Sequence, residues 1–334
     1  MSSAIAPMSR RWAAGIDIGS DEIRLVIVSK RGRHMPPVRV EHLAAAPLAA
    51  GVMSKPGGVD QGAVIDALTE LIAQAPGVSN KLSCAMAVPG IATVATSVAL
   101  PQLMPRAAPI HLNHTLDALE LAVFAHAERM AGVERHALAV DWFIDEHDRA
   151  GSPPYVTIVA TLKQHLEARL EIAAAAGIVL SVLDGEPPAA LRGLRHAAEL
   201  DLESHERYAA IWIGDDGLYG WRIAGGKIEA YIRYPAPEHE DLASALRALV
   251  NNATPGCAWV GGRLGAGLTL ADISDLLMCP VLPFECAPFC DDCEECDDCD
   301  DCDDCDQANT IPRELHHAPA FALAFGLALR GVCE

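Results

Sequence analysis

Three short glycine-containing segments hold the residues whose types could bind a charged ligand. They are Asp17-Ile18-Gly19-Ser20, Ile213-Gly214-Asp215-Asp216-Gly217, and a strand that ends in Gly261-Gly262. Backbone N–H groups exposed in a glycine turn can hold a phosphate, and a nearby carboxylate such as Asp17 can hold Mg²⁺ through water. A glycine pair at a strand end lets the backbone approach a flat ligand closely. Each segment taken alone is equally consistent with an ordinary turn.

The elements around these segments predict two similar α/β halves. Apolar, β-rich runs flank the first turn at residues 15–18 and 23–28 and the second turn at 208–213 and 218–223, with a further run at 228–234. Helical spacing of apolar residues predicts helices over 59–75, 115–131, 163–176 and 187–200. Strands are expected at 86–88, 93–100, 137–144, 155–161 and 178–183. Two halves of this kind place a cleft between them.

A cysteine-aspartate run, CDDCEECDDCDDCDDCD at residues 290–306, is the least ordinary part of the chain. Its cysteines recur every three residues, a spacing that superficially fits zinc or iron–sulfur sites: Cys290, Cys293, Cys296, Cys299, Cys302 and Cys305. The intervening residues are all Asp or Glu, which repel one another and bury nothing, so the run predicts a disordered surface loop. Adventitious binding of zinc or cadmium and slow thiol–disulfide coupling stay open as alternatives.

Composition limits the function classes. The 334 residues are 51% hydrophobic, enough for about two domains, and the net charge of -20 argues against a general nucleic-acid-binding surface. The N-terminus lacks the pattern of a secretory signal, and the longest apolar stretches fall well short of a membrane span, so we expect a cytoplasmic protein with reduced cysteines. The histidines and Ser20 form no triad or nucleophile elbow, so no catalytic residue is predicted.

In chain order, the three glycine segments resemble the nucleotide-contact segments of the actin, sugar-kinase and Hsp70 superfamily. Within it, the chain resembles the PilM family of cytoplasmic actin-like proteins of type IV pilus assembly, which is itself similar to FtsA. The resemblance is carried by these segments: Gly15 to Arg24 (GIDIGSDEIR), Val88-Pro89-Gly90, Val156 to Gly177, Val182 to Arg192, and Ala324 to Arg330 (AFGLALR). It extends from about residue 13 to residue 331.

The resemblance implies an α/β protein with an actin-like ATPase fold, two α/β halves around a cleft and an inserted SHS2-type subdomain. The expected parts are a disordered N-terminus (1–12), the first half (13–96 and 180–204), the SHS2-type subdomain (97–179) and the second half (205–331), which contains the loop 290–306. The implied cofactor is ATP with Mg²⁺. Its expected contacts are Asp17, Gly19 and Ser20 at the phosphates and metal, Gly214, Asp215 and Gly217 at the second phosphate turn, and Gly261 and Gly262 at the adenosine.

The implied function is a scaffold that recruits the N-terminal tail of a membrane-anchored, PilN-like pilus protein, peripheral to the inner membrane, with weak or absent ATPase activity and a possible homo-oligomeric state. The nucleotide segments depart from the family pattern, because Trp212 replaces an Asp and Asp21 and Glu22 replace small polar residues. Carboxylates beside a triphosphate weaken its binding. Alternatives are a sugar-kinase-type phosphotransferase, a metal-binding protein that uses the cysteine-aspartate run, and a role in the related type II secretion system.

Overall fold

The computed structural model describes residues 10–31, 38–49, 52, 60–75, 82–104, 112–145, 154–235, 242–250, 253–264, 269–290 and 312–333. The chain forms two compact units. The larger consists of Met1–Ala87 with Ile172–Glu334, and the smaller is Val88–Glu171.

The first sheet of the larger unit contains the first glycine turn. Its strands lie in the order β3-β2-β1-β4-β8: β1 (Arg10–Ile18), β2 (Glu22–Arg31), β3 (Arg39–Pro47), β4 (Ser83–Val88) and β8 (Leu180–Gly185). β1 and β2 form an antiparallel hairpin, and β1 runs parallel to β4. Helix α1 (Gln61–Gln74) buries Val64, Leu68 and Leu71 in the same apolar cluster as β1 and β2, and the side chain of Asp60 caps its first turn.

The second sheet repeats the first. Its strands, β9 (Arg207–Gly214), β10 (Gly217–Ala224), β11 (Lys227–Pro235), β12 (Cys257–Gly262) and β13 (Val281–Pro283), lie in the order β11-β10-β9-β12-β13. In both sheets the third, second, first, fourth and fifth strands of the half are neighbours in that order, which confirms the repeated layout predicted from the sequence. Helices α6 (Leu242–Val250) and α7 (Leu270–Leu277) pack together with β9 and β12 in one apolar cluster.

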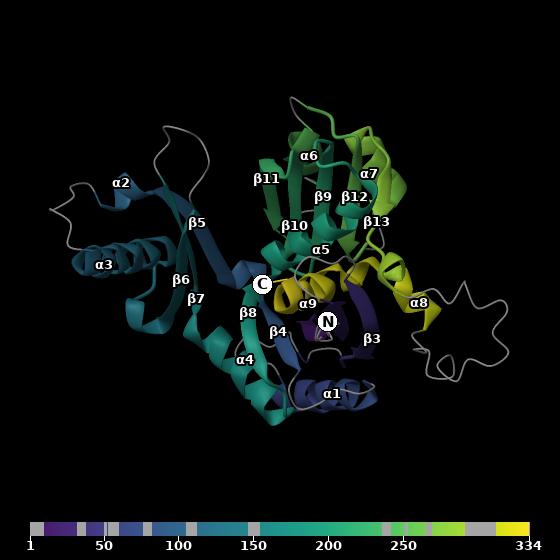
Figure 1. Cartoon of the computed structure of the whole chain (residues 1–334), viewed down its shortest axis with the longest axis horizontal. Helices are drawn as coiled ribbons and strands as arrows, with labels where there is room; N and C mark the ends of the chain where they lie inside the picture. Colours follow the sequence, from purple (N-terminus) through teal and green to yellow (C-terminus); the bar gives the residue numbers. More distant parts are fainter. Residues whose placement is uncertain are drawn as a thin grey trace, which may run out of the picture. The chain divides into compact units, whose positions relative to one another are not determined.

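Two helices, α5 (Glu186–Asp201) and α9 (Ala322–Cys333), join the two sheets (Figure 1). They share one buried cluster with residues of β1, β2, β9, β10 and β12. Glycine makes this packing possible, because a Cβ on Gly326 of α9 would lie 1.8 Å from the carbonyl oxygen of Ala189 in α5, and one on Gly193 would lie 2.4 Å from the carbonyl oxygen of Ala322. The backbones of α5 and α9 therefore approach more closely than side chains would allow.

The smaller unit is a three-stranded sheet with a helix on one face. Strands β5 (Thr93–Ala99), β7 (Tyr155–Leu162) and β6 (Leu138–Asp145) lie in the order β5-β7-β6 and pair antiparallel. Helix α3 (Leu112–Ala131) packs Leu119, Val123 and Ala127 on alternate residues of β7. Short helices α2 (Leu100–Leu103) and η2 (Arg135–Ala137) complete the unit, and α4 (Lys163–Ala175) follows β7. In the described ranges, no helix is long and apolar enough to cross a membrane.

Two predicted boundaries differ from the structure. Strand β1 begins at Arg10, so residues 10–12, expected to be disordered, belong to a strand; β2 is long enough to pair with them, and Arg10 forms an ion pair with Glu41 on β3. The compact inserted unit covers 88–171 rather than 97–179. The end of α4 lies outside this unit, because Ile172 and Ala173 are buried in the cluster of β1 and α1. The SHS2-type identity of the unit stays a prediction.

The partly buried imidazole of His196 predicts a pH-dependent stability. On α5, it stacks on Phe289 at 5.4 Å between ring centroids. Burial lowers its pKa, while Glu199 acts in the raising direction and Lys30 in the lowering one. The unfolded chain therefore binds a proton at His196 more readily than the folded chain does. The folded protein keeps its full stability above a pH of about 6.5 and loses part of it as the pH falls through that value. We expect the urea midpoint to fall less between pH 7.5 and 5.5 in His196→Leu than in the unaltered protein.

The exposed His136 supplies the control for this measurement. Its side chain is 79% exposed, so His136→Leu shows how far replacing a surface histidine by leucine alters the midpoint. If His196→Leu and the unaltered protein lost stability equally over this pH range, the assignment to His196 would be wrong.

Candidate functional site

The three predicted segments converge in the larger unit. Asp17, Gly19, Gly214, Asp215 and Gly262 line one small cavity, whose other lining residues are Arg24, Glu186, Trp212, Ile213, Arg263 and Leu323. Ser20 reaches the same place, because its backbone N–H donates a hydrogen bond to Oδ2 of Asp215 at 2.6 Å.

The two remaining predicted residues, Gly217 and Gly261, do not line this cavity. Gly217 begins β10, with φ of 143°. A Cβ on Gly261 would lie 2.7 Å from Cβ of Ala322 and 3.2 Å from Leu194, so this glycine lies against α5 and the start of α9. The absence of a side chain at Gly261 allows the helices to pack closely on β12.

Gly262 has the clearest geometric need for glycine. Its φ is 93°, and a Cβ there would lie 2.0 Å from the carbonyl oxygen of Ile213. The next residue, Arg263, donates its backbone N–H to that oxygen at 3.0 Å. This hydrogen bond holds the end of β12 against the end of β9, so the second and third glycine segments lie side by side.

Asp17 is held by an arginine on the neighbouring strand. The β1–β2 register places Asp17 opposite Arg24, and Nη1 of Arg24 lies 2.9 Å from Oδ2 of Asp17. Only 3% of Asp17 and 4% of Arg24 are exposed. Such a pair needs both partners, because either charge alone would be desolvated without compensation. The carboxylate expected to face a metal is thus already bound to a cation of the chain.

The second turn carries two carboxylates and an indole. The hydroxyl of Tyr219 donates to Oδ2 of Asp216 at 2.6 Å, and burial followed by this hydrogen bond raises the pKa of Tyr219. The Nε1 atom of Trp212, the residue found in place of the family's Asp, lies 2.8 Å from where a Cβ on Gly214 would be. Trp212 is 4% exposed, and its Nε1 has no hydrogen-bond partner among the described residues. The indole therefore fills the space behind the turn.

Arg263 is the site residue that the sequence analysis missed. Its Nη2 contacts Oδ1 of Asp21 directly and lies 3.9 Å from Oε2 of Glu22. Its Nη1 lies 3.9 Å from Oδ1 of Asp215. One guanidinium thus connects the acidic residues of the first turn with the second turn. The available signal was a single basic residue directly after Gly261-Gly262, in a region where the neighbouring turns are acidic.

These residues do not fit Mg²⁺ and ATP in this arrangement. The cavity has a volume of about 20 Å³, room for about one water molecule. Within the described ranges, no cluster of three or more His, Cys, Asp or Glu side chains could hold a metal ion. The acids nearest the turns are paired with Arg24 and Arg263, and the Ser20 N–H already binds a carboxylate. The chain's own groups occupy the places at which phosphate and cation were expected.

The cysteine-aspartate run is described only at its first residue. Sγ of Cys290 donates to the carbonyl oxygen of Cys286 at 3.4 Å. Cys293, Cys296, Cys299, Cys302 and Cys305 lie outside the described residues, so the disordered loop stays a prediction and metal binding by the run stays an alternative.

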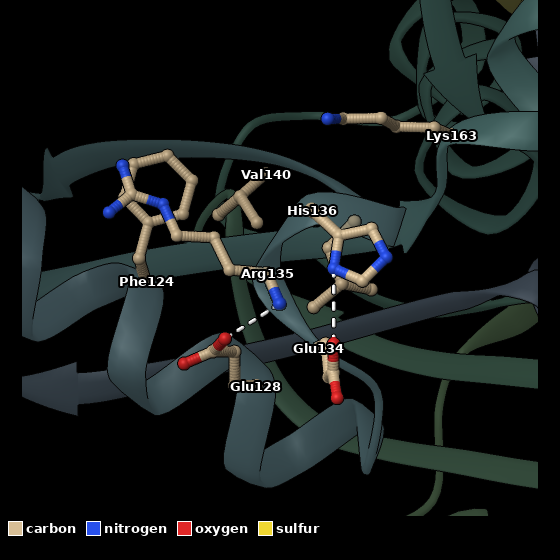
Figure 2. Close-up of a pocket in the computed structure, with 8 residues that line it drawn as sticks. Phe124, Glu128, Glu134, Arg135, His136, Val140 and Lys163 are labelled. Atoms are coloured by element: carbon tan, nitrogen blue, oxygen red, sulfur yellow. Dashed lines mark hydrogen bonds and ion pairs between the residues drawn. The ribbon is translucent and has the colours of Figure 1, made fainter.

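A larger pocket lies in the smaller unit, and none of the predicted site residues lines it (Figure 2). Its volume is about 670 Å³, and it is lined by residues of α3, η2, β6 and the start of α4: Phe124, Glu128, Glu134, Arg135, His136, Leu138, Val140 and Lys163. The Arg135 guanidinium lies over the Phe124 ring at 3.9 Å, and the Arg135 backbone N–H donates to Glu128 at 2.6 Å. His136 Nδ1 lies 3.2 Å from Glu134. Glu134 and His136 thus form an ion pair, Glu128 accepts a backbone N–H, and none of the lining residues belongs to the three glycine segments.

Comparisons with known proteins agree with this architecture. A family model described as type IV pilus assembly protein PilM matches residues 15–216. A solved PilM–PilN type IV pilus biogenesis complex is similar with a TM-score of 0.70 and 20% identity, over 96% of this chain and 98% of that one. No curated protein sequence matches the chain.

Two further solved structures are more distant. The ethanolamine utilization protein EutJ from Carboxydothermus hydrogenoformans has a TM-score of 0.45 and 16% identity, over 97% of this chain and 91% of that one. A Bacteroides thetaiotaomicron protein with an actin-like ATPase fold has a TM-score of 0.46 and 9% identity, over 87% and 96%. The similarity to the PilM–PilN structure, with its TM-score of 0.70, confirms the actin-like ATPase fold predicted from the sequence.

Proposed function

Since this chain belongs to the type IV pilus assembly protein PilM family, we propose that it is an actin-like scaffold that binds the N-terminal cytoplasmic tail of a membrane-anchored, PilN-like protein. It would act on the cytoplasmic side of the inner membrane, held there by its partner. The observation that carries this proposal is the match over residues 15–216, which includes the first turn, the whole smaller unit and the second turn.

The architecture supports a scaffold. The similar solved structure is a complex with PilN, and it agrees with this chain over nearly the full length of both. Both sheets pack through α5 and α9 into one apolar cluster, which gives an ordered, compact surface on which a peptide can be held. A short extended tail gains affinity when its binding surface is already ordered, because less conformational entropy is lost on binding.

The proposal includes no catalytic step. The actin-like ATPase fold is a general frame for nucleotides, but the small cavity at the glycine turns and the Asp17–Arg24 pair do not favour a phosphotransferase. Regulation by ATP with Mg²⁺, which the resemblance implied, is therefore a separate question from partner binding.

The direct test uses a fluorescently labelled synthetic peptide of the PilN-like protein's cytoplasmic tail. Purified full-length chain is titrated into the peptide in buffer that contains EDTA and no nucleotide, and fluorescence anisotropy is recorded. We expect saturable binding with a Kd on the order of micromolar, as is common for short peptides on ordered surfaces.

A peptide with the same composition in scrambled order is the control, because it keeps the charge and loses the order of side chains. Equal binding of both peptides, or no binding of either, would contradict the proposed recruitment. A second readout is flotation with liposomes. The chain should float with vesicles that contain the PilN-like protein and remain in the bottom fraction with vesicles that lack it.

A further inference from the structure

The glycine turns that would receive the phosphates and metal of a nucleotide are bridged by charged groups of the chain itself. Asp215 and Arg263 are the central residues of this bridge. Both belong to the second half of the chain, and both contact the first turn, at Ser20 and Asp21.

The first component is a carboxylate in place of a phosphate. Oδ2 of Asp215 accepts the backbone N–H of Ser20 at 2.6 Å and lies 3.6 Å from where a Cβ on Gly19 would be. A glycine turn presents its N–H groups to an anion, and a carboxylate satisfies that need as a phosphate oxygen would. A phosphate could bind Ser20 only after displacing Asp215.

The second component is a guanidinium in place of a metal ion. Arg263 contacts Asp21 and lies 3.9 Å from both Glu22 and Asp215. It therefore neutralises carboxylates of both turns, which is the task of a divalent cation between phosphates and acidic residues. Asp17 is held by Arg24 at 2.9 Å, and Nε of Arg24 also lies 3.3 Å from Oε1 of Glu22.

The third component is the small volume of the cavity at the glycine turns. The Trp212 indole lies behind Gly214, and the remaining cavity of about 20 Å³ admits about one water molecule. The four carboxylates of Asp17, Asp21, Glu22 and Asp215 outnumber the two arginines, so the turns carry excess negative charge. A triphosphate would meet both steric exclusion and charge repulsion.

We infer that an internal latch, formed by Asp215 and Arg263 on the first turn, keeps the two halves of the larger unit closed without nucleotide. In this chain, the closed form of an actin-like ATPase fold is a fixed property and not a response to ATP. Because the ion pairs of the latch are partly exposed, with 34% of the Arg263 and 43% of the Asp215 side chain accessible, salt should weaken it.

The first test is isothermal titration of the full-length protein with ATP and Mg²⁺, repeated with ADP. We expect no saturable heat at ligand concentrations of about 1 mM, and no change in the melting temperature at the same concentration. Binding with a Kd in the micromolar range, or a rise in melting temperature with ATP, would overturn the inference.

The second test measures the latch itself by hydrogen–deuterium exchange of peptides that span residues 17–24. Asp215→Ala removes the acceptor of the Ser20 N–H and is expected to accelerate exchange there about tenfold or more. Arg263→Gln should give a smaller acceleration, and raising the NaCl concentration should accelerate exchange in the unaltered protein.

Lys227→Gln is the matched control, since Lys227 is an exposed cation in the β10–β11 turn, on the same sheet but outside the latch. Exchange at 17–24 that is unchanged in both latch variants would show that the contacts do not hold the turn. The peptide-binding assay with EDTA tests the partner independently, so failure of the latch and failure of the proposed recruitment give different results.

Discussion

Replacing Gly326 with valine is expected to abolish folding of the larger unit or to lower its free energy of unfolding by more than about 4 kcal/mol. A Cβ at this position would lie 1.8 Å from the carbonyl oxygen of Ala189, which is a backbone atom and cannot rotate away. Relief requires α5 and α9 to separate, and their residues form much of the cluster that joins the two sheets. Urea unfolding followed by tryptophan fluorescence measures the effect.

Gly62→Ala supplies the comparison. Gly62 is an exposed helical glycine, and its nearest neighbour to a new Cβ is Oδ1 of Asp60 at 3.4 Å. Alanine there is expected to be neutral or to stabilise by up to about 1 kcal/mol, because it restricts the unfolded chain and favours the helix. An unchanged urea midpoint in Gly326→Ala as well as in Gly326→Val would show that the helices do not approach as described.

The second large effect is expected for Arg24→Met, which should cost about 3–5 kcal/mol. The substitution keeps much of the apolar stem but removes the cation 2.9 Å from the buried carboxylate of Asp17. Loss of one partner leaves a desolvated charge, and this penalty exceeds the net contribution of the intact pair. The double variant Asp17→Asn/Arg24→Met should therefore recover a substantial part of the lost stability, measured by the same unfolding curves.

Arg207→Met is the control for a surface pair. Arg207 lies 3.0 Å from Glu229, but its side chain is 42% exposed, so water compensates the lost contact and the expected effect is much smaller. If Arg24→Met destabilised no more than Arg207→Met, or if the double variant were as unstable as the sum of its single variants, the paired burial of Asp17 and Arg24 would not hold.

These results would separate two properties that an actin-like scaffold can combine. The Gly326 and Arg24 variants test whether the stability of the larger unit depends on these two residues. The titration with ATP tests whether the protein binds nucleotide. A protein that is closed by its own Asp215 and Arg263 can present a partner-binding surface at all times. Control of pilus assembly would then come from the availability of the partner and not from nucleotide.

The sequence by itself determined the repeated strand–turn–strand pattern, the order of the three glycine segments and the family. These depend on local features: alternation of apolar residues, glycine at turns, and motifs such as the AFGLALR segment in α9. Strand β3 was not predicted, because its RVEHLAAAP sequence has few β-branched residues. The buried Asp17 was predicted as a ligand for metal, since sequence does not show which strand neighbour will neutralise it.

Only the tertiary structure decided what fills the site. Ser20 and Asp215 are 195 residues apart, and Asp21 and Arg263 are 242 residues apart, so neither contact has a signature in local spacing. Gly326 belonged to a segment that carried the family resemblance, but its need for glycine comes from Ala189 on another helix. Charge and volume at a site depend on all the elements that converge there. The same Asp-Ile-Gly-Ser segment can therefore precede an open phosphate site or, as in this chain, a turn bound by its own carboxylate and arginine.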